Sequence, residues 1–253
     1  MVGRARVVVT LTMRYGLWTR RAVGVGLLAS VLLILAGSLA AARVAAFNMR
    51  LFEGLASALF LQVILIFVTL VNAAALIREE IEDHTLPYLL TRPISKPEVV
   101  AFKYVGYLAC VLVFLVPPLL LAYAVTVAYT GEGFSSHLDV LGGLMLVTLL
   151  ACMAYGALFL LLSILLRRPL AVGLLIGFVW ESIVSSVPGD VPKLSVIHYL
   201  RSIMKAAAPT GAFAGYTTDL SLGQATTVLT AFSLATLILS MVVFQRMEFG
   251  SKA

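Results

Sequence analysis

Charged residues are scarce in this sequence. Asp, Glu, Lys and Arg together make up 12% of its 253 residues, while hydrophobic residues make up 61%. Ordinary soluble domains carry about 25% charged residues. A soluble domain of this composition would have too little polar surface to cover its core. The composition therefore excludes an ordinary soluble protein and indicates an integral membrane protein.

Catalytic and ligand-binding motifs are also missing. The sequence has no G-x-x-x-x-G-K-[ST] loop to hold phosphates, and His84, His137 and His198 have no metal-ligand spacing. No Ser–His–Asp or paired-carboxylate arrangement stands out, and no basic stripe with interleaved aromatic residues points to nucleic acid. We expect this chain to bind no cofactor, metal or nucleic acid, and to hydrolyse no ATP by itself.

Only two cysteines are present, and both lie inside apolar runs. Cys110 and Cys152 are therefore expected to be small apolar core residues rather than a disulfide or metal pair. Gln62 and Asn72 are expected to hydrogen-bond between membrane helices. Two consecutive prolines, Pro117-Pro118, are expected to break or kink their helix, because they remove two successive N–H donors.

Six apolar runs are near the length of about 20 residues that crosses a bilayer as a helix. They comprise residues 22–42, 55–77, 104–128, 140–166, 170–187 and 225–244. No internal repeat is evident. The sequence predicts a single transmembrane domain over residues 1–253, an all-α bundle of six transmembrane helices.

The first 21 residues predict an amphipathic elbow helix at the membrane interface. Read as a helix, they place polar residues on one side and apolar residues on the other: Arg6, Thr10, Arg14 and Arg21 against Val8, Leu11, Tyr15 and Trp18. The alternative is the start of a signal peptide, with Ala40, Ala41 and Ala42 as small residues for cleavage. The apolar run that follows exceeds the usual signal-peptide core of about 7–15 residues, which favours an uncleaved first span.

Lysine and arginine are distributed unequally between the two sides of this bundle. One side receives 13 of the 18 and the other receives 5, namely Arg43, Arg50, Lys193, Arg201 and Lys205. Cytoplasmic loops carry the excess of positive residues. Both termini and the loop 78–103 are therefore predicted to be cytoplasmic, and the protein is expected in the plasma or inner membrane of the cell.

The loop 78–103 is the longest charged stretch between apolar runs, and an acidic cluster leads it. Thr85 can cap a short helix, and Leu86, Leu89 and Leu90 then share one face. Prolines 93 and 97 end this helix, and Lys96 and Lys103 follow. A short helix with one apolar face, framed by charge, is suited to dock into a groove of another protein.

The pattern of this loop resembles the loop between the second and third spans of ABC-2-type transporter permeases. The residues that match are Glu80, Thr85, Leu86, Leu89, Leu90, Pro93, Ser95, Lys96 and Lys103. His84 and Phe102 stand where that family usually has glycine. The resemblance implies a coupling helix that contacts a separate ATPase subunit, a complex of two permease and two ATPase subunits, and usually export.

The fifth apolar run carries one carboxylate, Glu181, and is followed by the predicted external loop 188–223. Glu181 is interpreted either as part of a translocation path or outer gate, or as a charge satisfied by a neighbouring helix or water. Within the loop, apolar residues recur at helical spacing, at Ile197, Leu200, Met204 and Ala207, and predict a short interfacial helix. Gly173 and Gly177 form a GxxxG pattern, for packing within the subunit or at a subunit interface.

Two other function classes remain open at this point. One is an ATPase-independent channel or secondary carrier, although such carriers often have inverted repeats and midplane charges, and this sequence offers only Glu181. The other is a membrane anchor, assembly factor or mechanotransmission subunit that moves no solute.

Overall fold

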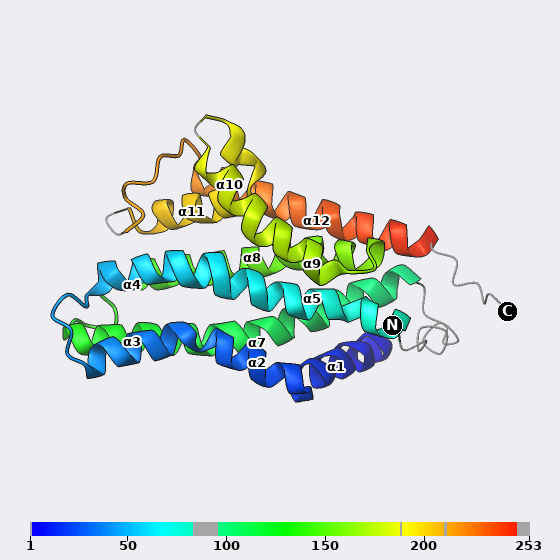
Figure 1. Cartoon of the computed structure of the whole chain (residues 1–253), viewed down its shortest axis with the longest axis horizontal. Helices are drawn as coiled ribbons and strands as arrows, with labels where there is room; N and C mark the ends of the chain where they lie inside the picture. Colours follow the sequence, from blue (N-terminus) through cyan, green and yellow to red (C-terminus); the bar gives the residue numbers. More distant parts are fainter. Residues whose placement is uncertain (1, 83–95, 188, 210–211, 247–253) are drawn as a thin grey trace.

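The computed structural model describes residues 2–82, 96–187, 189–209 and 212–246 (Figure 1). Its described residues are helical apart from connecting turns. In chain order the helices are α1 (Val2–Trp18), α2 (Arg20–Ala29), α3 (Val31–Ala41), α4 (Met49–Leu55), η1 (Ala56–Ile64), α5 (Leu65–Glu82), α7 (Lys96–Thr130), α8 (Leu138–Leu165), α9 (Pro169–Leu174), η2 (Leu175–Trp180), α10 (Glu181–Ser186), η3 (Val191–Leu194), α11 (Val196–Ala207) and α12 (Leu222–Arg246).

Five continuous helical segments are long and apolar enough to cross a membrane. They are Met49–Ile77, Lys96–Thr130, Leu138–Leu165, Pro169–Ser186 and Leu222–Arg246. They correspond to the second to sixth apolar runs of the sequence. The all-helical, multi-span architecture that the sequence predicts is therefore confirmed.

The first predicted span differs from the expectation of one uninterrupted helix over residues 22–42. It consists of α2 and α3, which meet at a bend of 43°. At the break, the Ser30 hydroxyl donates a hydrogen bond to the Gly26 carbonyl oxygen, at 2.8 Å. Such back-bonding by serine bends helices, and two nearby glycines lower the local helix propensity. The bent pair makes a sixth span if its two helices are counted as one.

Pro117 and Pro118 do not end their helix, since α7 runs without a break from Lys96 to Thr130. A break at these prolines is therefore wrong, whereas a kink, the other form of the expectation, stays a prediction. A proline removes one N–H donor but leaves the hydrogen bonds on either side of it intact, and membrane helices tolerate proline where neighbours satisfy the freed carbonyl groups.

Two spans contain stretches of π-helix instead of regular α-helix. In the second span this stretch is η1, and in the fifth span it is η2. A π-turn adds a residue to the helix and often occurs at functional sites. Gly177 in η2 and Gly173 in α9 both lie against α5: a Cβ atom on Gly177 would be 2.5 Å from Ile66, and one on Gly173 would be 2.2 Å from Leu70. The GxxxG pattern therefore packs within the subunit.

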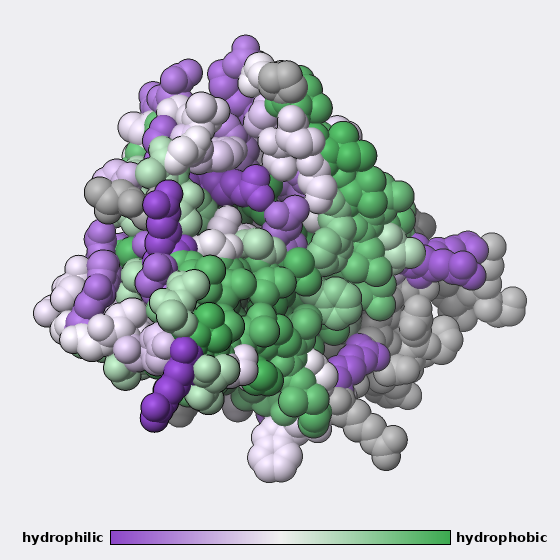
Figure 2. All heavy atoms as spheres, turned by 60° about the vertical axis from the view of Figure 1, so that its left-hand side comes forward, coloured by the Kyte–Doolittle hydropathy of each residue, from purple (hydrophilic) through white to green (hydrophobic). Residues whose placement is uncertain are grey.

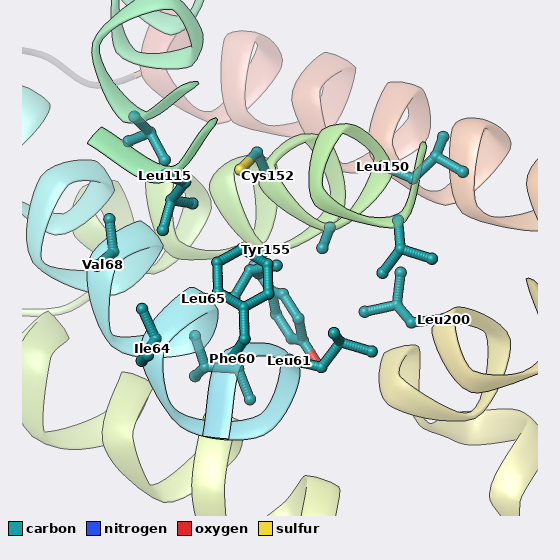
Figure 3. Close-up of a cluster of buried hydrophobic side chains, with 14 of the residues drawn as sticks. Phe60, Leu61, Ile64, Leu65, Val68, Leu115, Leu150, Cys152, Tyr155 and Leu200 are labelled. Atoms are coloured by element: carbon teal, nitrogen blue, oxygen red, sulfur yellow. The ribbon is translucent and has the colours of Figure 1, made fainter. Parts of the chain in front are cut away.

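Helix α8 forms the centre of the bundle and packs against α5, α7, α11 and α12. Figure 3 shows its buried side chains, including Tyr155 and Cys152, among residues of the second span, α7 and α11. Cys110 and Cys152 are both free and buried, as expected. Large apolar side chains are instead exposed on α12 and on the fifth span, where a bilayer would cover them.

The two ends of the bundle differ in what they carry. At one end α1 begins, α5 ends, α7 begins and α12 ends (Figure 1). At the opposite end lie the turn between α7 and α8 and the segment around α11. We call this opposite end the outer end, after the side on which the predicted topology places it. Both ends of the described chain therefore share one side with the borders of the predicted coupling loop.

Candidate functional site

Half of the predicted coupling stretch 78–103, residues 83–95, falls outside the described residues. This applies to five of its assigned residues, Thr85, Leu86, Leu89, Leu90 and Pro93. At its borders, helix α5 continues past the predicted span end at residue 77 to Glu82, and so includes Glu80 in its backbone. Helix α7 begins at Lys96, well before the predicted span start at residue 104. The loop between the two helices is therefore shorter than the sequence predicted.

Lys103 lies inside the protein rather than on its surface. Its side chain is buried, and Nζ donates a hydrogen bond to the carbonyl oxygen of Leu76, at 2.7 Å. This bond joins α7 to α5, the two helices that border the predicted coupling stretch. Lys103 thus fixes the spacing of these helices. Lys96, by contrast, is partly exposed as the first residue of α7.

Helix α1 packs along the first half of α7 through small residues. A Cβ atom on Gly106 would lie 2.8 Å from the Thr12 Cβ, and one on Gly16 would lie 2.7 Å from the Cys110 sulfur. The side facing away keeps Leu11 and Trp18 exposed, with Trp18 at 87%. The sequence missed the small-residue contact with α7, and the interfacial position of α1 stays a prediction.

Glu181 lies buried at the start of α10, directly after the π-helical turn η2. Its carboxylate accepts hydrogen bonds from the Ser195 hydroxyl and from the backbone N–H groups of Val196 and Ile197, the latter two at 3.2 Å. These donors form the N-terminus of α11. A helix N-terminus leaves N–H groups unpaired and carries a partial positive charge, so it stabilises a carboxylate. Glu181 therefore attaches α11 to the fifth span.

A second contact between these elements centres on Gln62 of η1. The Gln62 side-chain oxygen accepts from the Arg201 guanidinium at 3.0 Å, and its nitrogen donates to the Ser182 hydroxyl at 3.2 Å. Gln62 thus bridges the second span, the fifth span and α11, and the expectation of a hydrogen bond between helices is confirmed for it. Asn72 differs: its amide donates to the Val68 carbonyl of its own helix at 2.8 Å.

A second buried carboxylate, Glu53 of α4, holds the segment that follows α11. It accepts a hydrogen bond from the backbone N–H of Ala212. Glu53 and Glu181 have 3% and 2% of their surface exposed, so each burial is compensated by N–H or O–H donors rather than by water. The two carboxylates hold the outer segment on either side of α11.

His198 secures α11 to the same segment from within. Its Nδ1 lies 2.7 Å from the Tyr216 hydroxyl oxygen. Burial, together with the nearby positive charges of Lys193 and Arg201, holds the pKa of His198 below its ordinary value of 6.5. The imidazole is therefore neutral at physiological pH. Arg201 also lies over the Tyr216 ring, with Cζ 6.0 Å from the ring centroid.

The sequence singled out Glu181 but missed its partners and missed Glu53 and Arg201. Glu53 stands alone just before an apolar run, where a solvated position is the ordinary interpretation. Its one signal was a carboxylate directly adjacent to a membrane span, which is costly unless paired. Ser195 preceding a helical pattern was a recognisable N-terminal signal for α11.

The comparison with known families agrees with this architecture. Residues 25–249 match the model of a family described as ABC-2 family transporter protein. No curated protein matches the chain significantly. Because the family match spans most of the 253 residues, the chain belongs to the ABC-2 family of transporter proteins, the family that its loop 78–103 resembles.

Proposed function

We propose that this chain acts as the membrane-spanning permease subunit of an ABC transporter, a role that its family match supports. We propose that a separate ATPase subunit drives it, and that this subunit docks on the stretch 78–103 through a short helix with Leu86, Leu89 and Leu90 on its apolar face. ATP hydrolysis takes place on that partner, and a second permease subunit completes the membrane domain. Transport is directed outward, across the plasma or inner membrane.

One structural observation carries this proposal: the borders of the stretch 78–103 lie at the same end of the bundle as the start of α1 and the end of α12 (Figure 1). That end receives 13 of the 18 lysines and arginines under the predicted topology, which supports a cytoplasmic orientation. A cytoplasmic ATPase would reach the stretch directly. The bond from Lys103 to α5 supports a mechanical path from this stretch into the second and third spans.

Glu181 supports an outer gate in the same scheme. Its carboxylate holds the N-terminus of α11 across the outer end, beside the π-helical turns of the second and fifth spans. We propose that movement of these spans opens the outer end by shifting α11. In this scheme Glu181 acts by positioning α11 rather than by contacting the substrate.

The docking proposal predicts the effect of the double substitution Leu86→Asp, Leu89→Asp. A helix this short is marginal in water by itself, so its apolar face requires a partner surface. Each fully buried leucine contributes about 1.5–3 kcal/mol, and loss of two should weaken ATPase binding by roughly two orders of magnitude or more. The measurement is the ratio of ATPase to permease after affinity purification of the permease.

The matched control is Leu194→Asp, which places the same charge on an exposed leucine at the outer end. This variant should retain the wild-type ratio of ATPase to permease. The acidic cluster before Thr85 should matter less than the leucines, because exposed ion pairs contribute only about 0–1 kcal/mol each. A wild-type ratio in the double variant would refute docking through these leucines.

A further inference from the structure

Arg201 has no carboxylate partner in the part of the chain that the structure describes. No oxygen of a described Asp or Glu lies within 4.0 Å of its guanidinium. Glu181, on the neighbouring helix, is occupied by three donors at the N-terminus of α11. The positive charge of Arg201 is thus not neutralised by this neighbouring acid.

The guanidinium also has unused hydrogen-bonding capacity. Of its five N–H donors, the structure shows one bond, from Nη2 to Gln62. A guanidinium only donates, so the Gln62 side-chain oxygen faces Arg201 and the amide nitrogen donates to Ser182. Arg201 remains partly exposed, as do Gln62 and Tyr216. A ligand can therefore reach the remaining donors without unfolding α11.

A buried hydroxyl of α8 lies in the same region. The Tyr155 hydroxyl is fully buried beside the Glu181 carboxylate, which already accepts three hydrogen bonds at the N-terminus of α11. Glu181 is therefore surrounded by donors other than Arg201.

The depth of Arg201 restricts what could bind it. Its partner Gln62 lies seven residues beyond Leu55, the start of the second apolar run, or about 10 Å along a helix. The neighbouring fifth span exposes Val179, Trp180 and Ile183 to the surroundings. Figure 2 shows the polar outer end bordering directly on such an apolar flank. A group bound to Arg201 would meet polar donors on one side and an apolar surface on the other.

From these observations we propose that Arg201, with Gln62 and Ser182, binds the anionic group of an amphiphile in the outer half of the membrane. A guanidinium recognises carboxylate and phosphate oxygens through two parallel N–H bonds, and the exposed apolar side chains of the fifth span contact the apolar body. The proposal deepens the transport function proposed above by naming a ligand class, and it rests on that function only for its physiological meaning.

The test titrates lipid into the purified, detergent-solubilised permease and counts bound molecules by native mass spectrometry. Phosphatidylglycerol should bind in preference to phosphatidylcholine. Arg201→Gln should weaken phosphatidylglycerol binding about tenfold or more, the effect of losing a charge-assisted hydrogen bond. Arg201→Lys, which keeps the charge but not the fork, should give an intermediate affinity. Because no ATPase is present, the result is independent of the coupling proposal.

The matched control is Lys193→Gln, which removes the same charge from an exposed lysine at the outer end that is paired with Asp190. It should leave binding unchanged. Equal binding of the two lipids to the wild type, or an undiminished affinity in Arg201→Gln, would overturn the site. If Arg201→Gln does not fold, Arg201→Lys replaces it in the test. A phosphatidylglycerol affinity below that of the wild type then supports the site, and an equal affinity overturns it. Displacement of the lipid by equimolar inorganic phosphate would overturn the assignment of an amphiphile as the ligand and leave only a simple anion site.

Discussion

Buried carboxylates at the outer end accept hydrogen bonds from backbone N–H groups rather than forming ion pairs with cations. Glu181 holds the start of α11, and Glu53 holds Ala212 beyond its end. In an apolar environment an acceptor with several donors is far more stable than an unpaired charge. The attachment of the outer segment therefore depends on the side chains of Glu181 and Glu53 as well as on its apolar contacts.

This dependence predicts the effect of Glu181→Gln. The amide nitrogen cannot accept a hydrogen bond, so at least one donor at the N-terminus of α11 loses its partner, and the helix loses a favourable negative charge. We expect destabilisation of about 1–3 kcal/mol, seen as a lower melting temperature and faster hydrogen exchange of the α11 amides.

The control is Glu132→Gln, the same substitution at an exposed carboxylate of the outer end that contacts His137. Exposed pairs of this kind contribute about 0–1 kcal/mol, so melting and exchange should change little. Equal protection of the α11 amides in Glu181→Gln and wild type would show that apolar packing alone holds this helix.

At the scale of helices, glycine determines how closely neighbours approach. Gly156 of α8 faces Tyr107 of α7, and a Cβ atom there would lie 2.3 Å from the tyrosine ring. Gly142 lies on the same helix, with open space around its Cβ position. Position 156 therefore has no room for a methyl group, whereas position 142 on the same helix does.

We expect Gly156→Ala to destabilise the bundle by about 1–3 kcal/mol, because the added methyl group overpacks a buried contact. Gly142→Ala should be neutral or stabilising by up to about 1 kcal/mol, the gain in helix propensity. Thermal unfolding of both variants in the same detergent is the measurement. Equal melting temperatures for the two would show that α7 and α8 are not packed this closely.

Sequence periodicity predicted the helices well where apolar residues alone determine their position. It predicted them poorly where a few polar contacts determine the local geometry. The second to sixth spans follow from long apolar runs. The bend at Ser30 depends on one hydroxyl bonding its own backbone, and no apolar pattern marked the π-helical stretches η1 and η2. Lys103 was grouped with surface residues by its motif, whereas its contact with Leu76 requires the folded α5 and α7.

The candidate site was predicted only in part for the same reason. Glu181 stood out because a carboxylate in an apolar run is costly. Its partners Ser195, Val196 and Ile197 lie 14 to 16 residues further along the chain, and Arg201 contacts a residue 139 positions away. No local pattern encodes such contacts, so the hydrogen-bond network could only be seen in the folded chain.

For the whole molecule, two loops at opposite ends of the bundle give a test of membrane orientation. The charge asymmetry predicts that the stretch 78–103 is cytoplasmic and that the turn between α7 and α8 is external. Single cysteines placed at Ser95 and Ser135, with Cys110 and Cys152 replaced, should differ in how they are labelled in intact cells. A membrane-impermeant thiol reagent should label position 135 and not position 95.

Opened cells provide the control, because both positions should then react. Labelling of position 95 in intact cells would reverse the orientation, and with it the ATPase docking proposed for this stretch. Absence of labelling at position 135 in both conditions would show that the turn is shielded, and Ser136 in the same turn would then be used in its place.

The hydrogen bonds of the outer end also dictate an order of biogenesis. Gln62 bonds to residues 120 and 139 positions away, and Glu53 bonds to one 159 positions away. Contacts of such sequence separation form late, since their loop closure must come first. During synthesis, the second span therefore waits in the bilayer with Glu53 and Gln62 lacking these partners until the fifth span and α11 emerge. A chain truncated before α11 would lack Arg201 and Ala212, so Gln62 and Glu53 would keep unpaired polar atoms.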